Sequence, residues 1–222
     1  VSEVNRMDKV INVENACLTI NKNVILDNID FEAGEGEIVG IVGRNGSGKT
    51  MLMKCICGFI PLTSGRITVD GKEIGKDVDF PASTGVIIET PGFVPYYTGF
   101  HNLKILSEIG TRIPDERIKE AMKLVGLDPG LKRHVGKYSL GMRQRLGIAQ
   151  AIMEDQRILI LDEPFNGLDA DGVVDIRRLL LEYKEQGRTV LIASHIAQDI
   201  NILCDKTIFL NKGKISEQEA LR

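Results

Sequence analysis

The sequence lacks the features that mark a membrane-spanning, secreted or broadly nucleic-acid-binding chain. No apolar run approaches the ~20 residues needed to cross a bilayer, so we expect another chain to do any membrane spanning. The polar start, VSEVNRMDKV, is not a signal peptide. A formal net charge of -3 and a pI of about 5.7 leave no overall basic field that would attract nucleic acid.

Cysteine is scarce and tryptophan is absent. The four cysteines form no regular framework, and Cys55 and Cys57 lie too close together for the usual zinc spacing. We expect reduced, buried thiols that act as small hydrophobes, which suits a cytosolic protein. With 222 residues, of which 43% are hydrophobic and 27% charged, the chain can form one large domain, with or without a subdomain.

Strand and helix patterns alternate along the chain. Strands are predicted at 9–20, 24–32, 34–43, 66–71, 83–89, 157–164 and 189–195, with a closing hairpin at 207–216. Helices are predicted at 50–60, 171–187 and 196–206, and within a block from about 91 to 153. This alternation predicts an α/β fold in which helices wrap a parallel sheet, and the helical block is a candidate subdomain.

The stretch GRNGSGKT, residues 43–50, matches G-x-x-x-x-G-K-[ST] and lies between an apolar strand and a helix. Backbone N–H groups must approach a phosphate chain closely there, and side chains at positions 46 and 48 would obstruct them. The helix start adds partial positive charge. Lys49 should then reach the β- and γ-phosphates of a bound nucleotide, and Thr50 should ligate Mg²⁺. The expected nucleotide contacts are Gly43, Arg44, Asn45, Gly46, Ser47, Gly48, Lys49, Thr50 and Met51.

A second acidic site ends the buried run RILILDEP, residues 157–164. Asp162 is expected to hold Mg²⁺ or its water shell from the edge of the sheet. Because adjacent side chains of a strand alternate, Glu163 should point the other way and serve as the base for an attacking water. Two acids at a strand end are often only a solvated turn, but a preceding phosphate loop favours the catalytic interpretation.

Three further motifs follow in order: YSLGMRQRLGIAQA at 138–151, NGLD at 166–169, and Ser194-His195. With them the chain resembles the ATP-binding subunits of ABC transporters over nearly all of its length. The resemblance implies a P-loop NTPase core with a mostly parallel sheet, an N-terminal antiparallel β subdomain and an inserted helical subdomain. It places the ATP-binding domain at 7–222, the helical subdomain at about 91–153, and a polar extension at 1–6.

The resemblance also implies how the site works. Two such domains pack head to tail around two ATPs, so that Ser139 and Gly141, at a helix start, cap a phosphate bound by the other protomer. Asp169 belongs to the D-loop, and His195 is the switch histidine that contacts the γ-phosphate and holds water in line. We expect a monomer when nucleotide is absent. The implied catalytic residues are Glu163, His195 and Lys49.

The chain departs from the family pattern at three places. Glu89 stands where the family has a glutamine that touches Mg²⁺ and the transmembrane partner. Its oxygen suits a metal, although it adds charge, and a simple surface acid is the competing interpretation. Residues 1–30 contain no aromatic residue to stack on adenine, and Ile20, near the expected place, offers only apolar contact. The signature of the family usually has two adjacent glycines and then glutamine, whereas this chain has Leu140, Gly141 and Met142. Gly141 is kept where the backbone must approach phosphate.

The signature, Glu89 and the phrase PGFVPYYTGFHNL together resemble the subgroup that exports bacitracin-like or lantibiotic peptides. The expected partners are a transmembrane permease on a separate chain and a second nucleotide-binding domain in an ATP-dependent homodimer, with no nucleic acid. The expected location is cytoplasmic, held at the inner face of the cell membrane by the permease. A groove near residues 89–101 is expected to dock that permease. The aromatic cluster of this stretch is either an exposed patch or internal packing. It comprises the four aromatic residues Phe93, Tyr96, Tyr97 and Phe100, together with the aliphatic Val94.

Two other functions stay open. One is a soluble ATPase of the same type that acts on DNA or ribosomes. DNA-repair members insert a long coiled coil between the phosphate loop and the signature, and no sufficient heptad run is present here. Ribosome-acting members usually carry two nucleotide domains, and this chain has one. The other function is a regulator that does not hydrolyse ATP, which the retained Lys49, Asp162, Glu163 and His195 disfavour.

Overall fold

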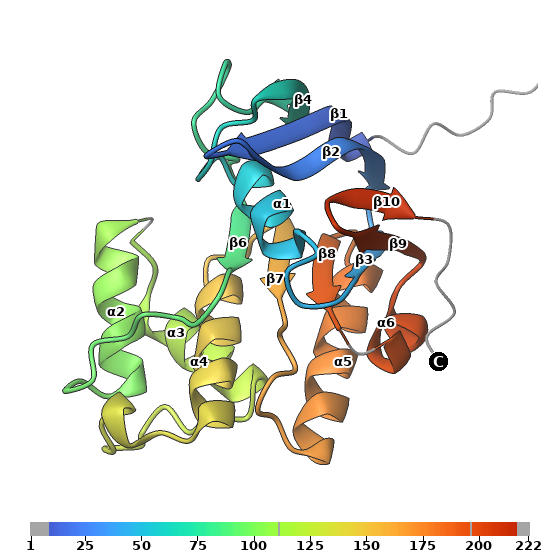
Figure 1. Cartoon of the computed structure of the whole chain (residues 1–222). Helices are drawn as coiled ribbons and strands as arrows, with labels where there is room; N and C mark the ends of the chain where they lie inside the picture. Colours follow the sequence, from blue (N-terminus) through green and yellow to red (C-terminus); the bar gives the residue numbers. More distant parts are fainter. Residues whose placement is uncertain (1–8, 111, 196, 217–222) are drawn as a thin grey trace, which may run out of the picture.

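The computed structural model describes residues 9–110, 112–195 and 197–216, which form two β-sheets with helices packed around them (Figure 1). The polar extension expected at residues 1–6 lies outside the described residues. The larger sheet has the strand order β10-β9-β3-β8-β7-β6, and the smaller one has the order β2-β1-β4-β5.

The larger sheet is parallel except for β10, which pairs antiparallel with β9. Its strands are β3 (Ile38–Val42), β6 (Thr84–Ile87), β7 (Ile158–Asp162), β8 (Thr189–Ser194), β9 (Lys206–Asn211) and β10 (Lys214–Ser216). The central strands β3, β7 and β8 are buried along their whole lengths, as a parallel sheet covered on both faces requires. The predicted strands and the closing hairpin are confirmed, with boundaries that differ by a few residues.

Alternate side chains of the central strands enter two different hydrophobic cores, because successive residues of a strand face opposite ways. On one face, Ile38, Leu159 and Val190 pack with residues of the helices from α2 to α6. On the other face, Ile160 and Leu191 pack with α1 and the smaller sheet. The helices outside the 91–153 block are α1 (Lys49–Ile56), α5 (Ala170–Glu185) and α6 (Ala197–Leu203).

The smaller sheet is antiparallel and lies on the far side of α1 from the parallel sheet (Figure 1). Its strands are β1 (Lys9–Ile20), β2 (Asn23–Gly34), β4 (Ser64–Val69) and β5 (Lys72–Glu73). This arrangement matches the expected N-terminal antiparallel β subdomain. Helix α1 ends at Ile56, short of the predicted residue 60. The reason is Gly58, which has a φ of 76° and no room for a Cβ beside the carbonyl of Asp79.

The helices expected between 91 and 153 lie together at one side of the molecule (Figure 1). They are α2 (Gly99–Ile109), α3 (Asp115–Leu124) and α4 (Leu140–Ile152), with the short 3-10 turn η1 (Val135–Lys137) before α4. Side-chain hydroxyls cap α2 and α4. Thr98 Oγ1 accepts from the N–H of His101 at 3.2 Å, and Ser139 Oγ accepts from the N–H of Met142 at 3.1 Å. Within the described ranges, no helix is both long and apolar enough to span a membrane.

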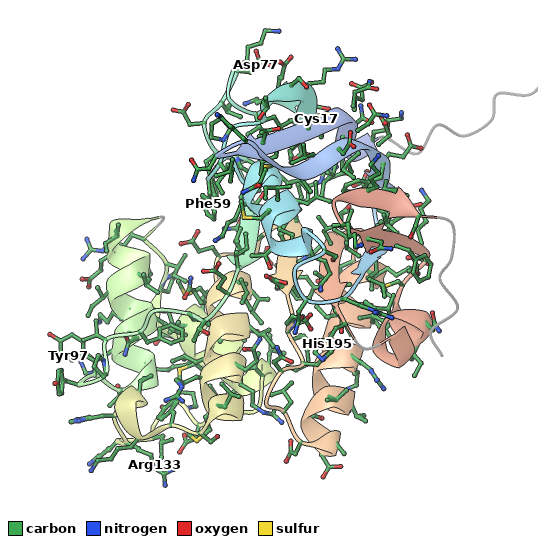
Figure 2. All side chains as sticks on the ribbon, viewed as in Figure 1. Cys17, Phe59, Asp77, Tyr97, Arg133 and His195 are labelled. Atoms are coloured by element: carbon green, nitrogen blue, oxygen red, sulfur yellow. The ribbon has the colours of Figure 1, made fainter. Side chains whose placement is uncertain are left out.

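The four cysteines are free thiols, as expected. Cys55 and Cys57 are buried, and burial raises the pKa of each thiol to about 12. Cys17, on the smaller sheet (Figure 2), and Cys204 are only half-buried. The expectation of full burial therefore holds for two of the four.

Candidate active site

The phosphate loop joins β3 to α1, and its backbone needs glycine. Gly46 and Gly48 have φ values of 79° and 110°, which residues with side chains rarely adopt. A Cβ on Gly43 would lie 2.3 Å from the carbonyl oxygen of Leu210. Gly48 is the N-cap of α1 and supplies no side-chain hydrogen bond. The first N–H groups of the helix therefore face the loop as donors for an anion.

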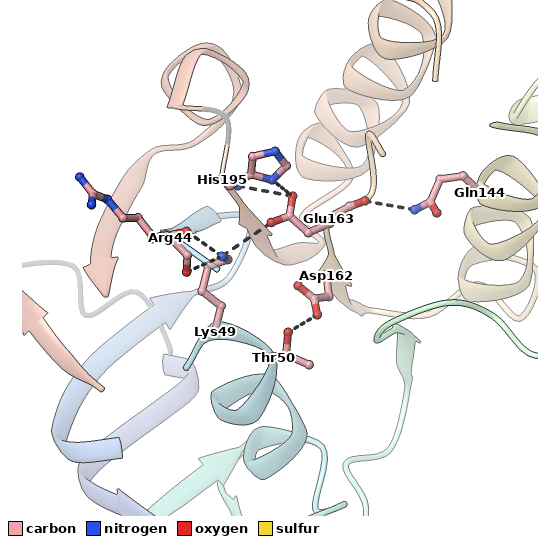
Figure 3. Close-up of polar contacts among 8 residues, drawn as sticks. Arg44, Lys49, Thr50, Gln144, Asp162, Glu163 and His195 are labelled. Carbon is pink, nitrogen blue, oxygen red and sulfur yellow. Dashed lines mark hydrogen bonds and ion pairs between the residues drawn. The ribbon is translucent and has the colours of Figure 1, made fainter. Parts of the chain in front are cut away.

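Lys49 lies buried beneath the loop, with 6% of its surface exposed. Its Nζ donates to the carbonyl oxygen of Gly43 at 2.7 Å and to that of Arg44 at 3.5 Å (Figure 3). The same Nζ lies 3.7 Å from Oε1 of Glu163. The ammonium is thus placed between the loop, where a phosphate would bind, and an acid that could activate water.

Asp162 and Thr50 form the second part of the centre. Thr50 Oγ1 donates to Asp162 Oδ2 at 2.6 Å, while Oδ1 of this buried carboxylate has no hydrogen-bond partner among the described residues. Burial raises the pKa of Asp162; the Thr50 hydrogen bond and Lys49 oppose the rise, and the carboxylates of Glu163 and Glu89 add to it. A free carboxylate oxygen beside a hydroxyl is a hard donor set that suits Mg²⁺.

The wider surroundings fit this metal. In the part of the chain that the structure describes, no group of three or more His, Cys, Asp or Glu side chains forms a self-contained metal site. Mg²⁺ at nucleotide sites takes only one or two protein ligands and completes its shell with phosphate and water oxygens. Thr50 and Asp162 are therefore sufficient as the protein's share.

Glu163 and Asp162 direct their carboxylates apart, as predicted, but the reason differs from the prediction. Strand β7 ends at Asp162, so strand alternation does not reach Glu163. Glu163 instead has a left-handed backbone with a φ of 49°, and this turns its carboxylate toward β8. Its Oε2 accepts from the N–H of His195 at 3.4 Å and lies 2.8 Å from the ring Nδ1 of His195 (Figure 3).

The remaining loop residues surround this centre. Arg44 and Asn45 are exposed, and Met51 is half-buried at the start of α1. Ser47 is buried, and its Oγ has no hydrogen-bond partner among the described residues. A buried hydroxyl with unused capacity in a phosphate loop is consistent with the predicted nucleotide contact.

Glu89 is placed near the centre without joining it. Its side chain is 63% exposed, and its Oε1 accepts from Lys54 Nζ of α1 at 2.6 Å. It is close enough to raise the pKa of Asp162 by charge repulsion. Its role as a metal ligand stays a prediction, because its bond goes to Lys54.

Ser139, Gly141 and Asp169 form a separate group. A Cβ on Gly141 would lie 2.6 Å from the carbonyl oxygen of Gly167, so the start of α4 packs on the 166–169 loop. Ser139 and Asp169 are exposed, and each caps a helix through its side chain. Figure 1 shows the start of α4 at the end of that helix remote from β7. The structure therefore does not bring Ser139 of this chain to its own Lys49.

The hairpin of β1 and β2 lies beside the phosphate loop. A Cβ on Gly48 would lie 3.2 Å from the carbonyl oxygen of Ile25 in β2. Ile20 ends β1 with 36% of its surface exposed, and Val24 across the turn is 60% exposed. Apolar contact with a base, as predicted for Ile20, is compatible with this position.

A groove of about 550 Å³ lies between β6, α2 and the end of α4. It contains Thr90, Pro91 and Gly92 of the stretch where a docking groove was expected, but the aromatic cluster at 93–100 does not line it. That cluster is divided between the two interpretations given above. Phe93 and Phe100 pack partly against the core, whereas Val94, Tyr96 and Tyr97 are exposed. Tyr97 is labelled in Figure 2.

The sequence did not single out Gln144 or Lys54. Gln144 is buried on α4, and its Nε2 donates to the backbone carbonyl oxygen of Glu163 at 3.3 Å (Figure 3). The available signal was helical spacing, because Gln144 and Ile148 are four residues apart and share the inward face of α4. A polar residue on that face needs a partner, and the spacing alone did not say which.

Comparison with known proteins gives concordant matches. A family described as ABC transporter matches residues 26–166. The uncharacterized ABC transporter ATP-binding protein YybJ of Bacillus subtilis is 44% identical over 95% of this chain and 96% of its own. The bacitracin transport ATP-binding protein BcrA of Enterococcus faecalis is 36% identical over 96% of this chain and 70% of its own. The lantibiotic transport ATP-binding protein SrtF of Streptococcus pyogenes is 34% identical over 93% of this chain and 89% of its own.

The fold also matches solved structures. The dimeric structure of MJ0796, a bacterial ABC transporter cassette, superposes with a TM-score of 0.84 at 24% identity, over 96% of this chain and 99% of that one. The post-hydrolysis dimer of the same cassette bound to ADP and Pi has a TM-score of 0.83 at 22% identity, over 96% and 99%. At these identities the likeness shows the fold.

Proposed function

This chain belongs to the ABC transporter family as an ATP-binding subunit with ATPase activity, and we propose that it powers a membrane exporter of small antimicrobial peptides. Similarity to the bacitracin and lantibiotic transport proteins supports that substrate class. The expected location is the cytoplasmic face of the membrane, where a permease on another chain would hold the subunit.

The observation that carries the proposal is the meeting of Lys49, Glu163 and His195 at the end of the parallel sheet. The loop N–H groups and Lys49 would bind the β- and γ-phosphates. Mg²⁺, when bound by Thr50 and Asp162, would neutralise charge on the phosphates. Glu163 would take a proton from water as the water oxygen attacks the γ-phosphorus, and the bond from that phosphorus to the bridging oxygen would break so that ADP leaves. His195 would hold the Glu163 carboxylate in line.

The second half of each site is proposed to come from another copy of the chain. Ser139 is exposed at the start of α4, where the helix dipole favours an anion, and the exposed 166–169 loop packs against it. Because this surface lies away from Lys49 in the same chain, a head-to-tail pair lets each copy complete the other's site. ATP held between the copies would stabilise the dimer, and hydrolysis would release it.

The groove between β6, α2 and α4 is proposed to receive a cytoplasmic segment of the permease. Its rim carries exposed apolar side chains: Phe59 is 55% exposed and stacks on Phe80, and Ile109 is 80% exposed. Large apolar side chains gathered around a concavity are typical of partner sites. No nucleic-acid surface is proposed, since the chain is acidic overall.

Lys49→Ala tests the ATPase directly. The variant should lose at least ~100-fold in kcat for ATP, because a buried cation next to the transferred phosphate is removed. Lys72→Ala, which removes an exposed lysine on β5, is the matched control and should match the unaltered chain. Phosphate release by the purified chain with Mg²⁺ and ATP is the readout. Equal turnover by Lys49→Ala would overturn the proposed site.

A further inference from the structure

Gln144 connects helix α4 to the backbone of Glu163. It lies in the second turn of α4 with 7% of its surface exposed. Its side-chain amide donates to the backbone carbonyl of Glu163, the residue placed as the base (Figure 3). A helix of the 91–153 block therefore reaches the catalytic backbone itself.

The backbone of Glu163 depends on such contacts for its shape. Its left-handed φ of 49° is uncommon for a residue with a side chain and persists where surrounding bonds hold it. The N–H of Glu163 donates to the carbonyl of Ala193 at 2.9 Å, and its carbonyl accepts from the N–H of Asn166 at 3.1 Å as well as from Gln144. These bonds set the direction of the carboxylate toward His195 and Lys49.

The same two turns of α4 also hold the far end of the loop that follows Glu163. The Nη2 atom of Arg145 lies 3.9 Å from an oxygen of Asp169 and 3.7 Å from one of Asp175. Leu140 packs against Gly167, where a Cβ would lie 2.5 Å from the Leu140 side chain. Helix α4 thus contacts the 163–169 segment at both ends and near its middle.

We propose that Gln144 is a positioning residue for ATP hydrolysis. Its amide holds the carbonyl of Glu163 so that the carboxylate stays aligned with His195. Ser139, five residues earlier, caps the same helix and lies about 8 Å away along its axis. Gln144 therefore ties the helix that meets the neighbouring protomer's nucleotide to the base of its own protomer. This role rests on the proposed ATPase function.

The test compares Gln144→Met, which keeps the length and removes the donor, with Gln144→Glu, which places an acceptor opposite the carbonyl. For the full chain with Mg²⁺ and ATP, we expect Gln144→Met to lower kcat about tenfold and to leave KM within about twofold, since small displacements of a reacting group lower rate more than binding. Gln144→Glu should lower kcat by more than tenfold. The Tm of Gln144→Met should fall by no more than about 3 °C, because Asn166 still satisfies the Glu163 carbonyl.

Asn102→Leu is the matched structural control. Asn102 is also a buried amide that donates to backbone carbonyls, those of Val94 and Thr98, but it lies on α2 away from the centre. The Asn102→Leu variant should have a lower Tm than the unaltered chain. Its kcat should be unchanged at a temperature where the variant is folded. If Gln144→Met behaves in the same way, Gln144 is only a packing residue and the proposed role is wrong.

A double variant tests whether Gln144 affects hydrolysis through Glu163 or independently of it. In the Glu163→Gln background the base is already absent, so adding Gln144→Met should leave the residual single-turnover rate within about twofold. A further tenfold loss would show that Gln144 acts independently of Glu163 and would overturn the proposal. If the unaltered chain does not hydrolyse ATP, the proposed function is wrong. If the unaltered chain hydrolyses ATP and Gln144→Met has the same kcat, only the proposed role of Gln144 is wrong.

Discussion

The Nδ1 atom of His195 lies 2.8 Å from the Oε2 atom of Glu163. The two residues follow strands that are neighbours in the sheet, with Asp162 of β7 paired to Ala193 of β8. Because parallel strands end at the same edge, a residue one place beyond β7 meets a residue just beyond β8. The histidine is thus held against the acid by sheet register.

Removal of this contact should slow chemistry more than binding. We predict that His195→Ala lowers kcat about 100-fold with KM for ATP changed less than about threefold, because Glu163 loses its orienting partner while Lys49 and the loop remain. Steady-state phosphate release checks this. His134→Ala, which removes an exposed histidine before η1, should have no effect. A His195→Ala variant with unchanged kcat would remove the histidine from the mechanism.

Neutralising Asp162 should stabilise the chain while disabling it. Burial raises the folded-state pKa of Asp162, so the ionised form present at neutral pH costs folding free energy. That cost is absent below the ordinary pKa of 3.8 and grows as the pH rises from there through the folded pKa. Asp162→Asn should therefore raise Tm in EDTA at pH 7 by about 3 °C, which corresponds to about 1 kcal/mol. Glu163→Gln, half-buried beside Lys49, should show no such gain. A lower Tm for Asp162→Asn would contradict this reasoning.

The same substitution should also remove the response to magnesium. Mg²⁺ with ATP should raise the Tm of the unaltered chain, and Asp162→Asn should lose most of the metal-dependent part of that rise. Differential scanning fluorimetry with ATP, in Mg²⁺ and in EDTA, separates the two contributions. An undiminished magnesium effect would show that Asp162 is not the protein's main metal ligand.

Asp205 is predicted to give the fold a pH-dependent contribution. Burial alone would raise its pKa, but the N–H of Ile38, at 2.9 Å from Oδ2, and the ion pair with Lys184 outweigh burial and lower it. A lowered pKa means that this stability is present at neutral pH and is lost as pH falls below the ordinary value of 3.8 and through the folded one. Asp205→Asn should lower the free energy of unfolding by about 1 kcal/mol at pH 7, with solvent screening of the exposed pair taken into account.

The difference between the Asp205→Asn variant and the unaltered chain should shrink as the solution is made more acidic. Urea unfolding at pH 7 and near pH 3 measures it. Glu185→Gln removes an exposed negative charge at the end of α5 and serves as the control. A difference that stays constant with pH would mean that Asp205 does not titrate between the two states as described.

Much of the fold and the centre follows from local patterns. The glycine spacing from Gly43 to Gly48 predicted the turn, because Gly46 and Gly48 adopt φ values that residues with side chains rarely adopt and Gly43 has no room for a Cβ. The uninterrupted apolar runs of β3, β7 and β8 predicted buried parallel strands. The family resemblance, rather than a local pattern, implied that His195 and the base Glu163 act at the same phosphate, and their side chains lie 2.8 Å apart.

What the patterns missed depends on contacts between segments distant in sequence. Nothing near Gln144 in the chain shows that its amide meets a carbonyl 19 residues later, and nothing near Lys54 shows that it pairs with Glu89, 35 residues away. The left-handed backbone of Glu163 was also missed, because strand alternation was extended one residue too far. The aromatic stretch at 93–100 was ambiguous for a similar reason, since only packing decides which rings are covered.

The central claim is that ATP joins two copies of this chain through the Lys49 centre of one and the Ser139 end of the other. The most direct measurement is size-exclusion chromatography with light scattering of Glu163→Gln in Mg²⁺ and ATP. The account predicts a species of twice the 24.5 kDa chain mass with ATP, and a monomer with ADP or when Lys49→Ala is added. A Glu163→Gln variant that binds ATP and remains monomeric would contradict it.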